Sequence, residues 1–474
     1  MADPLDDLTR RGLLRGLGLS LGALAAGSLR APLFAAPRPL APDWRLPVAR
    51  AKRVVWLHMA GGPSPMDLFD PKPLLQERNG EPAPERLFEG ERFAFIEGVP
   101  RLLGSPYSFA RHGESGAELS ELLPATAAIA DRLTFVRSMH TKSFNHAPAQ
   151  IVMSTGHERL GRPSFGAWLS WGLGPLNPDL PAFVVLTSGA YQPSGGAALW
   201  GSAFLPTVHQ GVRLRSSGEP VLYLSAPEGL SRDDRRRSLD TLRALNELAQ
   251  SRSGDPEVET RVQQYELAWR MQQSVPELSD LSREPAAVRE AYGIVEGRPG
   301  FADNCLLARR LLERDVRFVQ LYHWGWDSHG TGEGDDLLTS LPKRCMETDR
   351  ACARLVTDLA ERGLLEDTLV VWAGEFGRTP MNEERNGSKY LGRDHHPRAF
   401  TIWMAGGGLR PGLTHGATDE FGWEVVEGAM DVNDLHATLL HQLGVDHERF
   451  TYRSQGRDFR LTDVAGRVVR ELLA

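Results

Sequence analysis

Residues 368–408 read TLVVWAGEFGRTPMNEERNGSKYLGRDHHPRAFTIWMAGGG. The segment contains two apolar runs, 369–373 and 399–405, of the kind that form strands buried on both faces of a sheet. The loops beside these runs carry side chains that bind metal ions or anions: Glu375, Arg378, Arg393, Asp394, His395 and His396. This concentration of polar groups next to two buried strands predicts one wall of a polar site.

The same order of buried strand, polar loop and helix recurs along the chain. Further apolar runs, each followed by a polar or glycine-rich loop or turn, lie at 53–59, 133–139, 181–186 and 317–322. This order predicts an α/β fold in which a mostly parallel central sheet is covered by helices on both faces. Ligands of open α/β sheets bind at the carboxyl ends of the strands, so we expect the polar loops to meet there.

Length and composition describe an ordinary globular protein with material for a large core. The chain has 474 residues, of which 41% are hydrophobic and 24% charged, and its formal net charge is -7. Length alone suggests about three domains, but α/β enzymes often use such a chain for one sheet with insertions. We expect a single domain over 48–470, with surface insertions near 79–113 and 188–222. The negative net charge argues against nucleic acid as a partner.

The N-terminus resembles an export signal. Arg10 and Arg11 precede a weakly apolar segment rich in Gly and Ala, 16–27, as in twin-arginine signals. We assign 1–36 to this signal and the start of a linker, and an amphipathic N-terminal helix is the alternative. The apolar segment is short and interrupted by Gly, so we expect no membrane span in the mature protein. The expected location is periplasmic or extracellular.

A charged stretch from Ser231 to about Gln273 has the pattern of a helix. Its apolar residues, among them Leu242, Leu245 and Tyr265, are expected to pack in the core rather than to bind a cofactor.

The loop after the run 317–322 carries the donor groups of a metal site. Asp327 and His329 follow His323 within seven residues, and a carboxylate with imidazoles suits zinc or another borderline metal. A lone histidine is usually structural, but this loop is matched by a second cluster of His and Asp at 394–396. The pattern therefore favours metal or anion binding.

The loop after the run 133–139 leads into a predicted helix through Asn145 and His146. Free backbone N–H groups and the helix dipole at such a position favour an anion. The structural alternative is a capped helix in which His146 is merely hydrogen-bonded.

Taken together, these loops resemble the domain-of-unknown-function 1501 family between about Arg53 and Val468. The motifs that carry the resemblance are long: GGPS at 61–64, FDPKP at 69–73, NHAP at 145–148, WDSH at 326–329, GEFGRTP at 374–380, GRDHHP at 392–397, DLHAT at 434–438 and YRSQGRD at 452–458. Proteins of that family are exported, and their fold is similar to that of the alkaline phosphatase and sulfatase superfamily. The resemblance therefore implies an alkaline phosphatase-like domain.

The resemblance also implies a divalent, zinc-like metal and a set of ligands for it. In the superfamily's arrangement an Asp-His-His set would be formed by Asp327 and His329 with either His395 or His396. Glu375 falls where a further metal-binding Asp would stand.

Three positions depart from the superfamily's pattern. The Asp expected at the end of the first strand is replaced by Ala60-Gly61-Gly62, so Asp67 or Asp70 would have to loop back to serve as a ligand. Phe376 stands where a His is expected. The place of the Ser or Thr nucleophile is held by His146.

The identity of the nucleophile therefore stays open. Either His146 is itself the nucleophile or a ligand, or Thr141 or Ser143 takes the place of the nucleophile, or a metal-activated water attacks directly. The sulfatase signature of Cys or Ser, then Pro and Arg at alternate positions, is absent from the sequence, which disfavours a formylglycine sulfatase.

Two functions follow as expectations. The first is an exported, metal-dependent hydrolase of phosphate or sulfate esters, some of them linked to glycans, in which Arg378 neutralises the anionic transition state and His146 and Asn145 stand at the reaction centre. The second is a non-catalytic protein that binds a glycan or an anionic partner in the altered cleft. Polar groups gathered at strand ends favour the enzyme.

Overall fold

The computed structural model describes residues 43–46, 48–188, 192–214, 231–253 and 256–474. The predicted twin-arginine segment lies outside these residues, as do parts of the predicted insertion at 188–222. Residues 44–474 form one compact unit, which contains the central sheet and the helices around it.

Among the described residues, nine strands form the central sheet, in the order β14-β5-β13-β9-β1-β8-β6-β7, with β17 paired to β5. Their bounds are β1 Arg53–Ala60, β5 Thr134–His140, β6 Phe183–Ser188, β7 Val212–Leu214, β8 Phe318–Trp324, β9 Thr368–Ala373, β13 Phe400–Ala405, β14 Leu413–His415 and β17 Met430–Asp431. The pairs of β1 with β8 and β9, and of β6 with β7 and β8, are parallel.

Strand β13 runs against both of its neighbours, β5 and β9. Its first residue therefore lies at the edge of the sheet where β5 and β9 end. Residues that precede β13 in the chain, His395 among them, are brought to the carboxyl edge by this reversal. The other polar loops reach that edge because they follow parallel strands.

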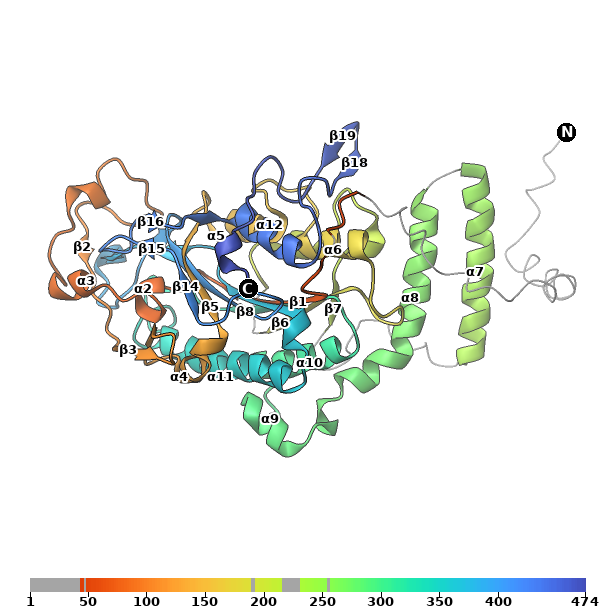
Figure 1. The fold of residues 1–474 in the computed structure, drawn as a ribbon, viewed down its shortest axis with the longest axis horizontal. Coiled ribbons are helices and arrows are strands. Elements are labelled where there is room, and N and C mark those ends of the chain that lie inside the picture. The colour runs from red at the N-terminus through yellow and green to blue at the C-terminus, as the bar shows by residue number, and fades with distance from the viewer. Residues whose placement is uncertain (1–42, 47, 189–191, 215–230, 254–255) are drawn as a thin grey trace, which may run out of the picture. The chain divides into compact units, whose positions relative to one another are not determined.

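Helices cover both faces of the sheet (Figure 1). One face carries α4 (Pro124–Ala128), α10 (Phe301–Glu313) and α11 (Ser340–Glu361), and the other carries α5 (His146–Thr155), α6 (Phe165–Leu173) and α12 (Val432–Gln442). Along β1, Val55 and Leu57 join the core on the first face, whereas Val54 and Trp56 join the core on the second. The predicted α/β class, with a mostly parallel sheet between two helical layers, is confirmed.

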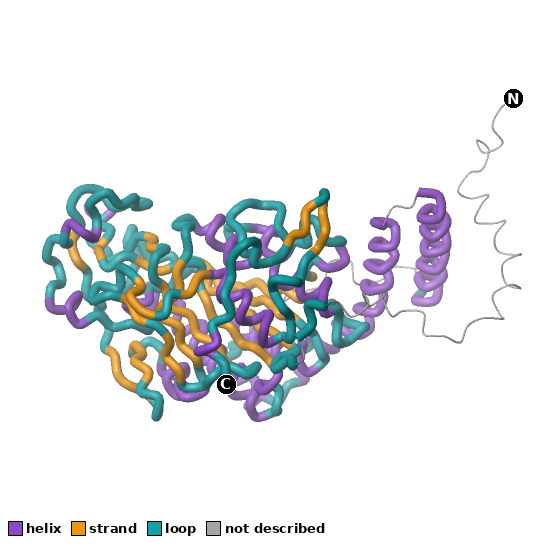
Figure 2. Tube along the Cα trace, turned by 45° about the horizontal axis from the view of Figure 1, so that its top comes forward, coloured by secondary structure: helices purple, strands orange, loops and turns teal. Residues whose placement is uncertain are grey.

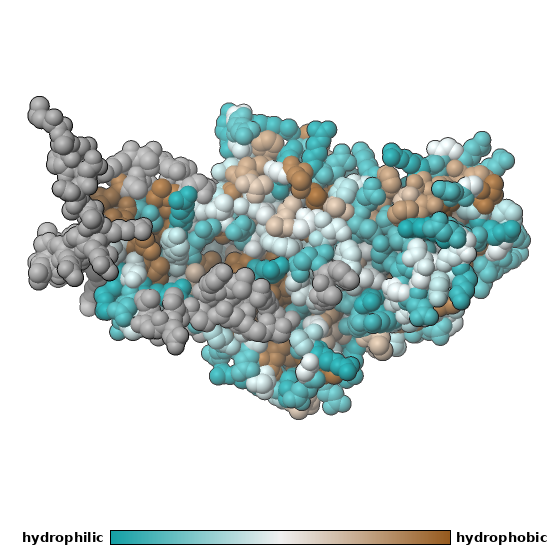
Figure 3. Space-filling model, turned by 180° about the vertical axis from the view of Figure 1, so that it is seen from behind, coloured by the Kyte–Doolittle hydropathy of each residue, from teal (hydrophilic) through white to brown (hydrophobic). Residues whose placement is uncertain are grey.

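Helices α7 (Arg232–Ser253) and α8 (Pro256–Ser279) pack against each other as a hairpin beside the sheet (Figure 2). The predicted helical stretch is thus two helices. Val262 and Met271 are buried as expected, but the expected burial is wrong for three of the named residues. Leu242 and Leu245 are 42% and 43% exposed, and Tyr265 is 48% exposed. Apolar atoms accordingly gather on the surface over this hairpin (Figure 3). The helical period was correct, but α7 has no sheet beneath it to cover its apolar side chains.

Shorter elements fill the connections. The helices are α2 Pro65–Leu68, α3 Pro73–Glu77 and α9 Ala286–Tyr292. The short strands are β2 Arg101–Leu102, β3 Phe109–His112, β4 Ala117–Ser120, β10 Gly377–Arg378, β11 Met381–Asn382, β12 His395–His396, β15 Ala417–Thr418, β16 Val425–Glu427, β18 Tyr452–Ser454 and β19 Arg457–Phe459. Among the described helices, none has the length and apolar character that crossing a membrane requires.

Candidate metal centre

Four side chains from three loops converge at the carboxyl edge of the sheet. They are His146 at the start of α5, Asp327 and His329 after β8, and His395 before β13. The Nε2 atoms of His329 and His395 lie 2.8 and 3.3 Å from Asp327 Oδ1, and His146 Nε2 lies 3.1 Å from Asp327 Oδ2. The four potential ligand atoms all lie within 4.8 Å of one another.

Each of the three histidines uses its other ring nitrogen to bind a fixed acceptor. Nδ1 of His146 lies 2.7 Å from Glu375 Oε1, and Nδ1 of His329 contacts Glu383 Oε2. Nδ1 of His395 lies 2.7 Å from the backbone oxygen of Phe144. These acceptors hold each ring with Nε2 directed into the cluster, which is the usual arrangement around metal-binding histidines.

Some of the converging nitrogen and oxygen atoms face each other as hydrogen-bond acceptors, which is unfavourable unless a cation lies between them. A carbonyl oxygen can only accept, so Nδ1 of His395 carries the hydrogen and its Nε2 faces Asp327 as a second acceptor. Burial lowers the pKa of His395 to about 4, so this ring is neutral at pH 7. His146 Nε2 is buried without a hydrogen-bond partner among the described residues. The donor set of three imidazoles and one carboxylate fits a zinc-like divalent ion.

When no metal is bound, protons on two of the histidines supply part of the positive charge at the site. Burial lowers the pKa of His146, but its contacts with Asp327 and Glu375 outweigh burial and raise that pKa to about 9. Burial also lowers the pKa of His329, and the contacts with Asp327 and Glu383 again raise it above its usual value. Metal binding must therefore displace protons from the site.

Glycines let the loops approach closely enough to form the cluster. Gly61 has a φ of 125°, and a Cβ atom there would lie 2.4 Å from the backbone nitrogen of Asp327. A Cβ atom on Gly392 would lie 1.9 Å from the carbonyl carbon of His329. Any side chain at these two positions would push apart the loops that carry the ligands.

Arg378 lies beneath the cluster and is 1% exposed. Its guanidinium donates to the backbone oxygens of Gly61, Gly62 and Arg393 and, through Nη2, to Asp327 Oδ1 at 2.5 Å. Burial raises the pKa of the Asp327 carboxyl, but Arg378 and the three histidines outweigh burial and hold it well below its usual range. Arg378 thus fixes the ligand loops and the charge of Asp327, and it offers no open face to an anion.

Glu375 lies behind His146 rather than among the four converging atoms. It is fully buried and accepts hydrogen bonds from the backbone of Gly61 and from Gln150 Nε2 in addition to its contact with His146. Burial raises the pKa of Glu375, but His146 and His58 outweigh burial and lower that pKa below its usual value. The carboxylate therefore orients His146.

Phe376 provides an apolar wall under two of the imidazoles. Its ring centroid lies 5.0 Å from that of His146 and 4.6 Å from that of His395. This phenyl group, which stands where the superfamily pattern has a histidine, limits the positions that the two imidazoles can take.

Three predicted site residues lie elsewhere. Asp67 is fully buried in a two-pronged ion pair with Arg393, with distances of 2.8 and 3.1 Å. His396 stacks on Trp423 and its Nε2 lies 2.6 Å from the Trp423 backbone oxygen. Asn145 is exposed, and its side chain does not cap α5.

Sequence reasoning missed several groups that complete the centre. Glu383, the buried partner of His329, belongs to the polar segment 374–397 and could have been suspected from that position alone. His58 is a histidine inside the apolar run of β1, and its Nε2 lies 3.4 Å from Glu375 Oε2. Phe95 comes from the predicted insertion, and its ring meets the ring of His329 edge-on at 4.9 Å. No local pattern indicated that this surface excursion returns to the site.

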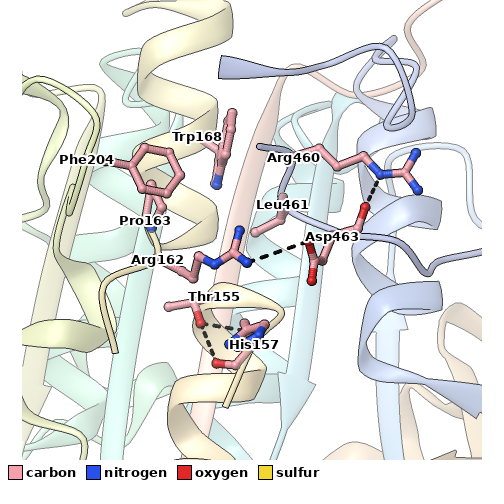
Figure 4. A pocket seen from close by; sticks show the side chains of 9 residues that line it. All are labelled: Thr155, His157, Arg162, Pro163, Trp168, Phe204, Arg460, Leu461 and Asp463. Carbon is pink, nitrogen blue, oxygen red and sulfur yellow. Dashed lines mark hydrogen bonds and ion pairs between the residues drawn. The ribbon is translucent and has the colours of Figure 1, made fainter. Parts of the chain in front are cut away.

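A separate pocket lies at the other end of α5, where Thr155 and His157 face Arg162, Arg460 and Asp463 (Figure 4). Arg162 Nη2 lies 3.6 Å from Asp463 Oδ1, and Arg460 donates to the backbone oxygen of Asp463. These contacts link the walls of the pocket, which contains none of the four converging side chains.

The Glu383→Gln variant is expected to bind Zn²⁺ about tenfold more weakly, because a neutral amide orients and polarises His329 less well than a carboxylate does. The neighbouring Glu384→Gln variant is the matched control, since Glu384 is exposed. Competition with a colorimetric chelator measures both affinities. Equal affinities in the two variants would show that Glu383 does not support a metal ligand.

Fold and site together define an α/β protein with a His-Asp centre at the carboxyl edge of its sheet. Residues 51–473 match the model of the family described as Protein of unknown function (DUF1501). The chain belongs to this family, as its motifs predicted. A search of curated protein sequences gives no match.

Several solved structures show some similarity to this chain. A phosphonate monoester hydrolase from Silicibacter pomeroyi is 12% identical, with 83% of this chain and 73% of that chain covered and a TM-score of 0.35. A sulfatase from Pseudoalteromonas sp. is 13% identical, with 84% and 69% covered and a TM-score of 0.35. An alkaline phosphatase from the Antarctic bacterium TAB5 is 11% identical, with 77% and 94% covered and a TM-score of 0.33.

Proposed function

We propose that this protein is an exported, metal-dependent hydrolase of phosphate or sulfate esters. The observation that carries the proposal is the convergence of three Nε2 atoms on Asp327, each from a histidine whose Nδ1 is bound to a fixed acceptor. The side chain of Asp327 is 31% exposed, so the centre is open to a ligand on that side. A purely structural metal site is normally closed by its ligands.

When bound there, a divalent ion would polarise an ester oxygen and lower the pKa of a coordinated water. The residues of the chain have supporting roles. His146, His329, His395 and Asp327 would hold the ion, Glu375 and Glu383 orient two of the imidazoles, and Arg378 keeps Asp327 ionised.

The attacking group in this proposal is water. His146 is anchored by Glu375 through Nδ1, and its buried Nε2 is directed toward Asp327 at 3.1 Å, which fits a ligand better than a nucleophile. A nucleophilic side chain would need a free lone pair aimed at the substrate and a base beside it.

Export forms part of the proposal, and Arg10-Arg11 with the apolar segment after them supports it. A route that carries folded proteins would suit a site assembled from distant loops. Esters linked to glycans are the substrates that we expect outside the cytoplasm.

The test is a panel of 4-nitrophenyl phosphate, 4-nitrophenyl sulfate and a phosphonate monoester, assayed with chelator-treated protein and with the same protein after metal is restored. We expect hydrolysis of at least one ester only after restoration. Protein that holds stoichiometric metal and hydrolyses none of the three would refute the proposal and favour the non-catalytic binding function.

A further inference from the structure

Phe95 is an exposed aromatic residue at the edge of the candidate metal centre. The residue is 41% exposed, and its ring lies 4.9 Å from the ring of His329 and 6.1 Å from that of His395, edge-on to both. Single exposed aromatic residues are ordinary on protein surfaces. This one stands beside two of the three proposed metal-binding histidines.

The backbone of Phe95 is held by a buried charge. Asp394 Oδ2 accepts hydrogen bonds from the backbone N–H groups of Phe95 at 2.7 Å and Ile96 at 3.0 Å. Its Oδ1 accepts from the backbone N–H of His395 at 2.7 Å. Asp394 is fully buried, and burying a carboxylate is costly unless it is well bonded. One carboxylate therefore fixes both the exposed ring and a metal-binding loop.

The ring of Phe95 is also held from one face. The guanidinium of Arg385 lies 3.3 Å from the ring centroid, which is stacking distance for a cation on an aromatic ring. Arg385 Nε in turn donates to Glu383 Oε1 at 2.6 Å, and Glu383 binds His329 through its other oxygen. The aromatic ring and the ligand histidine thus share one set of supporting groups.

An exposed ring held in this way is available to a ligand at the centre. The centre is open on the side of Asp327, whereas His329 and His395 have side chains only 7% and 4% exposed. If the anionic group of a ligand binds at the centre, the organic part of that ligand would lie along the neighbouring surface, which includes Phe95. A rigid aromatic surface there favours a flat or ring-shaped group with an apolar face.

We propose that Phe95, backed by Arg385, binds the organic part of the substrate, and that this part is a ring with an apolar face, such as an aryl group or a sugar. This inference rests on the proposed function, because it assumes that the anionic group of an ester occupies the metal centre. It gives the predicted surface insertion a role in substrate selection.

The test compares ligands that carry the same anion with and without a ring and that contain no ester bond. Metal-loaded protein is titrated calorimetrically with phenylphosphonate and methylphosphonate, and with benzenesulfonate and methanesulfonate. Wild type is expected to prefer the ring-bearing member of at least one pair. The Phe95→Leu variant is expected to bind that member about 3- to 10-fold more weakly, while its affinity for the methyl member stays unchanged.

Two further variants complete the test. Phe95→Trp is expected to restore the preference for the ring. Phe93→Leu is the matched control from the same segment, because Phe93 packs against Trp423 at 6.1 Å, and it is expected to bind like wild type. Metal content is measured in every sample.

The inference is overturned if wild type binds neither member of either pair, if it shows no preference for the ring, or if Phe95→Leu weakens both members equally. The ester panel is scored separately from binding. Ring-dependent binding without turnover refutes the hydrolase proposal alone. Turnover with binding that ignores the ring refutes the role of Phe95 alone.

Discussion

The His395→Gln variant is expected to lose its metal, and the His396→Gln variant is expected to keep it. The two histidines are adjacent in the chain, and the sequence left the choice between them open. In the structure, Nε2 of His395 lies 3.3 Å from Asp327, whereas Nε2 of His396 lies 2.6 Å from the backbone oxygen of Trp423. Only His395 has a free nitrogen directed toward the other three ligands.

The size of the effect follows from the role of the lost atom. Removing a group that only orients a ligand commonly costs 10- to 100-fold in metal affinity, so loss of a ligand itself is expected to cost about 100-fold or more. Glutamine at 396 can still donate a hydrogen bond to the Trp423 oxygen. The pair therefore differs in metal binding more than in folding.

Elemental analysis of both purified variants, with chelator competition for the affinity, measures this difference. Ester hydrolysis is expected to fall to background in His395→Gln and to persist in His396→Gln. Stoichiometric metal in His395→Gln, at wild-type affinity, would exclude His395 as a ligand.

The Asp67→Ala variant is expected to destabilise the fold by about 3–5 kcal/mol, because it leaves the guanidinium of Arg393 buried without its carboxylate. Both side chains are fully buried, and they are joined by two hydrogen bonds. Arg393 also donates to the backbone oxygens of Leu103 and Thr379, which cannot neutralise its charge. Asp67 therefore acts as a structural partner at a position where sequence reasoning expected a ligand.

A double variant separates the loss of the ion pair from the burial of a single charge. Asp67→Leu combined with Arg393→Met removes both charges and is expected to be more stable than Asp67→Ala, since apolar residues of similar volume often replace buried pairs at little cost. Midpoints of urea unfolding for wild type and both variants measure this. If Asp67→Ala unfolds at the wild-type midpoint, the pair does not stabilise the protein.

The sequence was sufficient for the six long strands of the sheet because they are apolar runs, which need no tertiary information to be recognised. The short strands β7, β14 and β17 carry no such pattern. The sequence also placed Asp327, His329 and His395 in loops at one edge. It could not separate His395 from His396, since that choice depends on which way a short strand presents its side chains. The sequence suggested Glu375 as a metal ligand and Arg378 as a group that contacts the anion. In the structure, hydrogen bonds with backbone groups hold both side chains beneath the cluster.

The leucines of α7 illustrate another property that the sequence alone could not predict. Their spacing indicates a helix with an apolar side, but periodicity cannot tell whether another element covers that side. The position of Phe95 could not be predicted for the same reason. Its contact with His329 depends on the tertiary structure, which brings the insertion back to a distant loop.

The reversed direction of β13 has a consequence for the order of assembly. Because β13 lies between β5 and β9, the loop that carries His395 reaches its place only when three strands from distant parts of the chain have paired. His395 and Asp327 are separated by 68 residues, and neither shares a hairpin with His146. Only Asp327 and His329 are close in the chain, so the full set of four side chains is not brought together by any local segment. Binding of a metal ion by all four side chains is therefore expected to require the paired strands of the sheet.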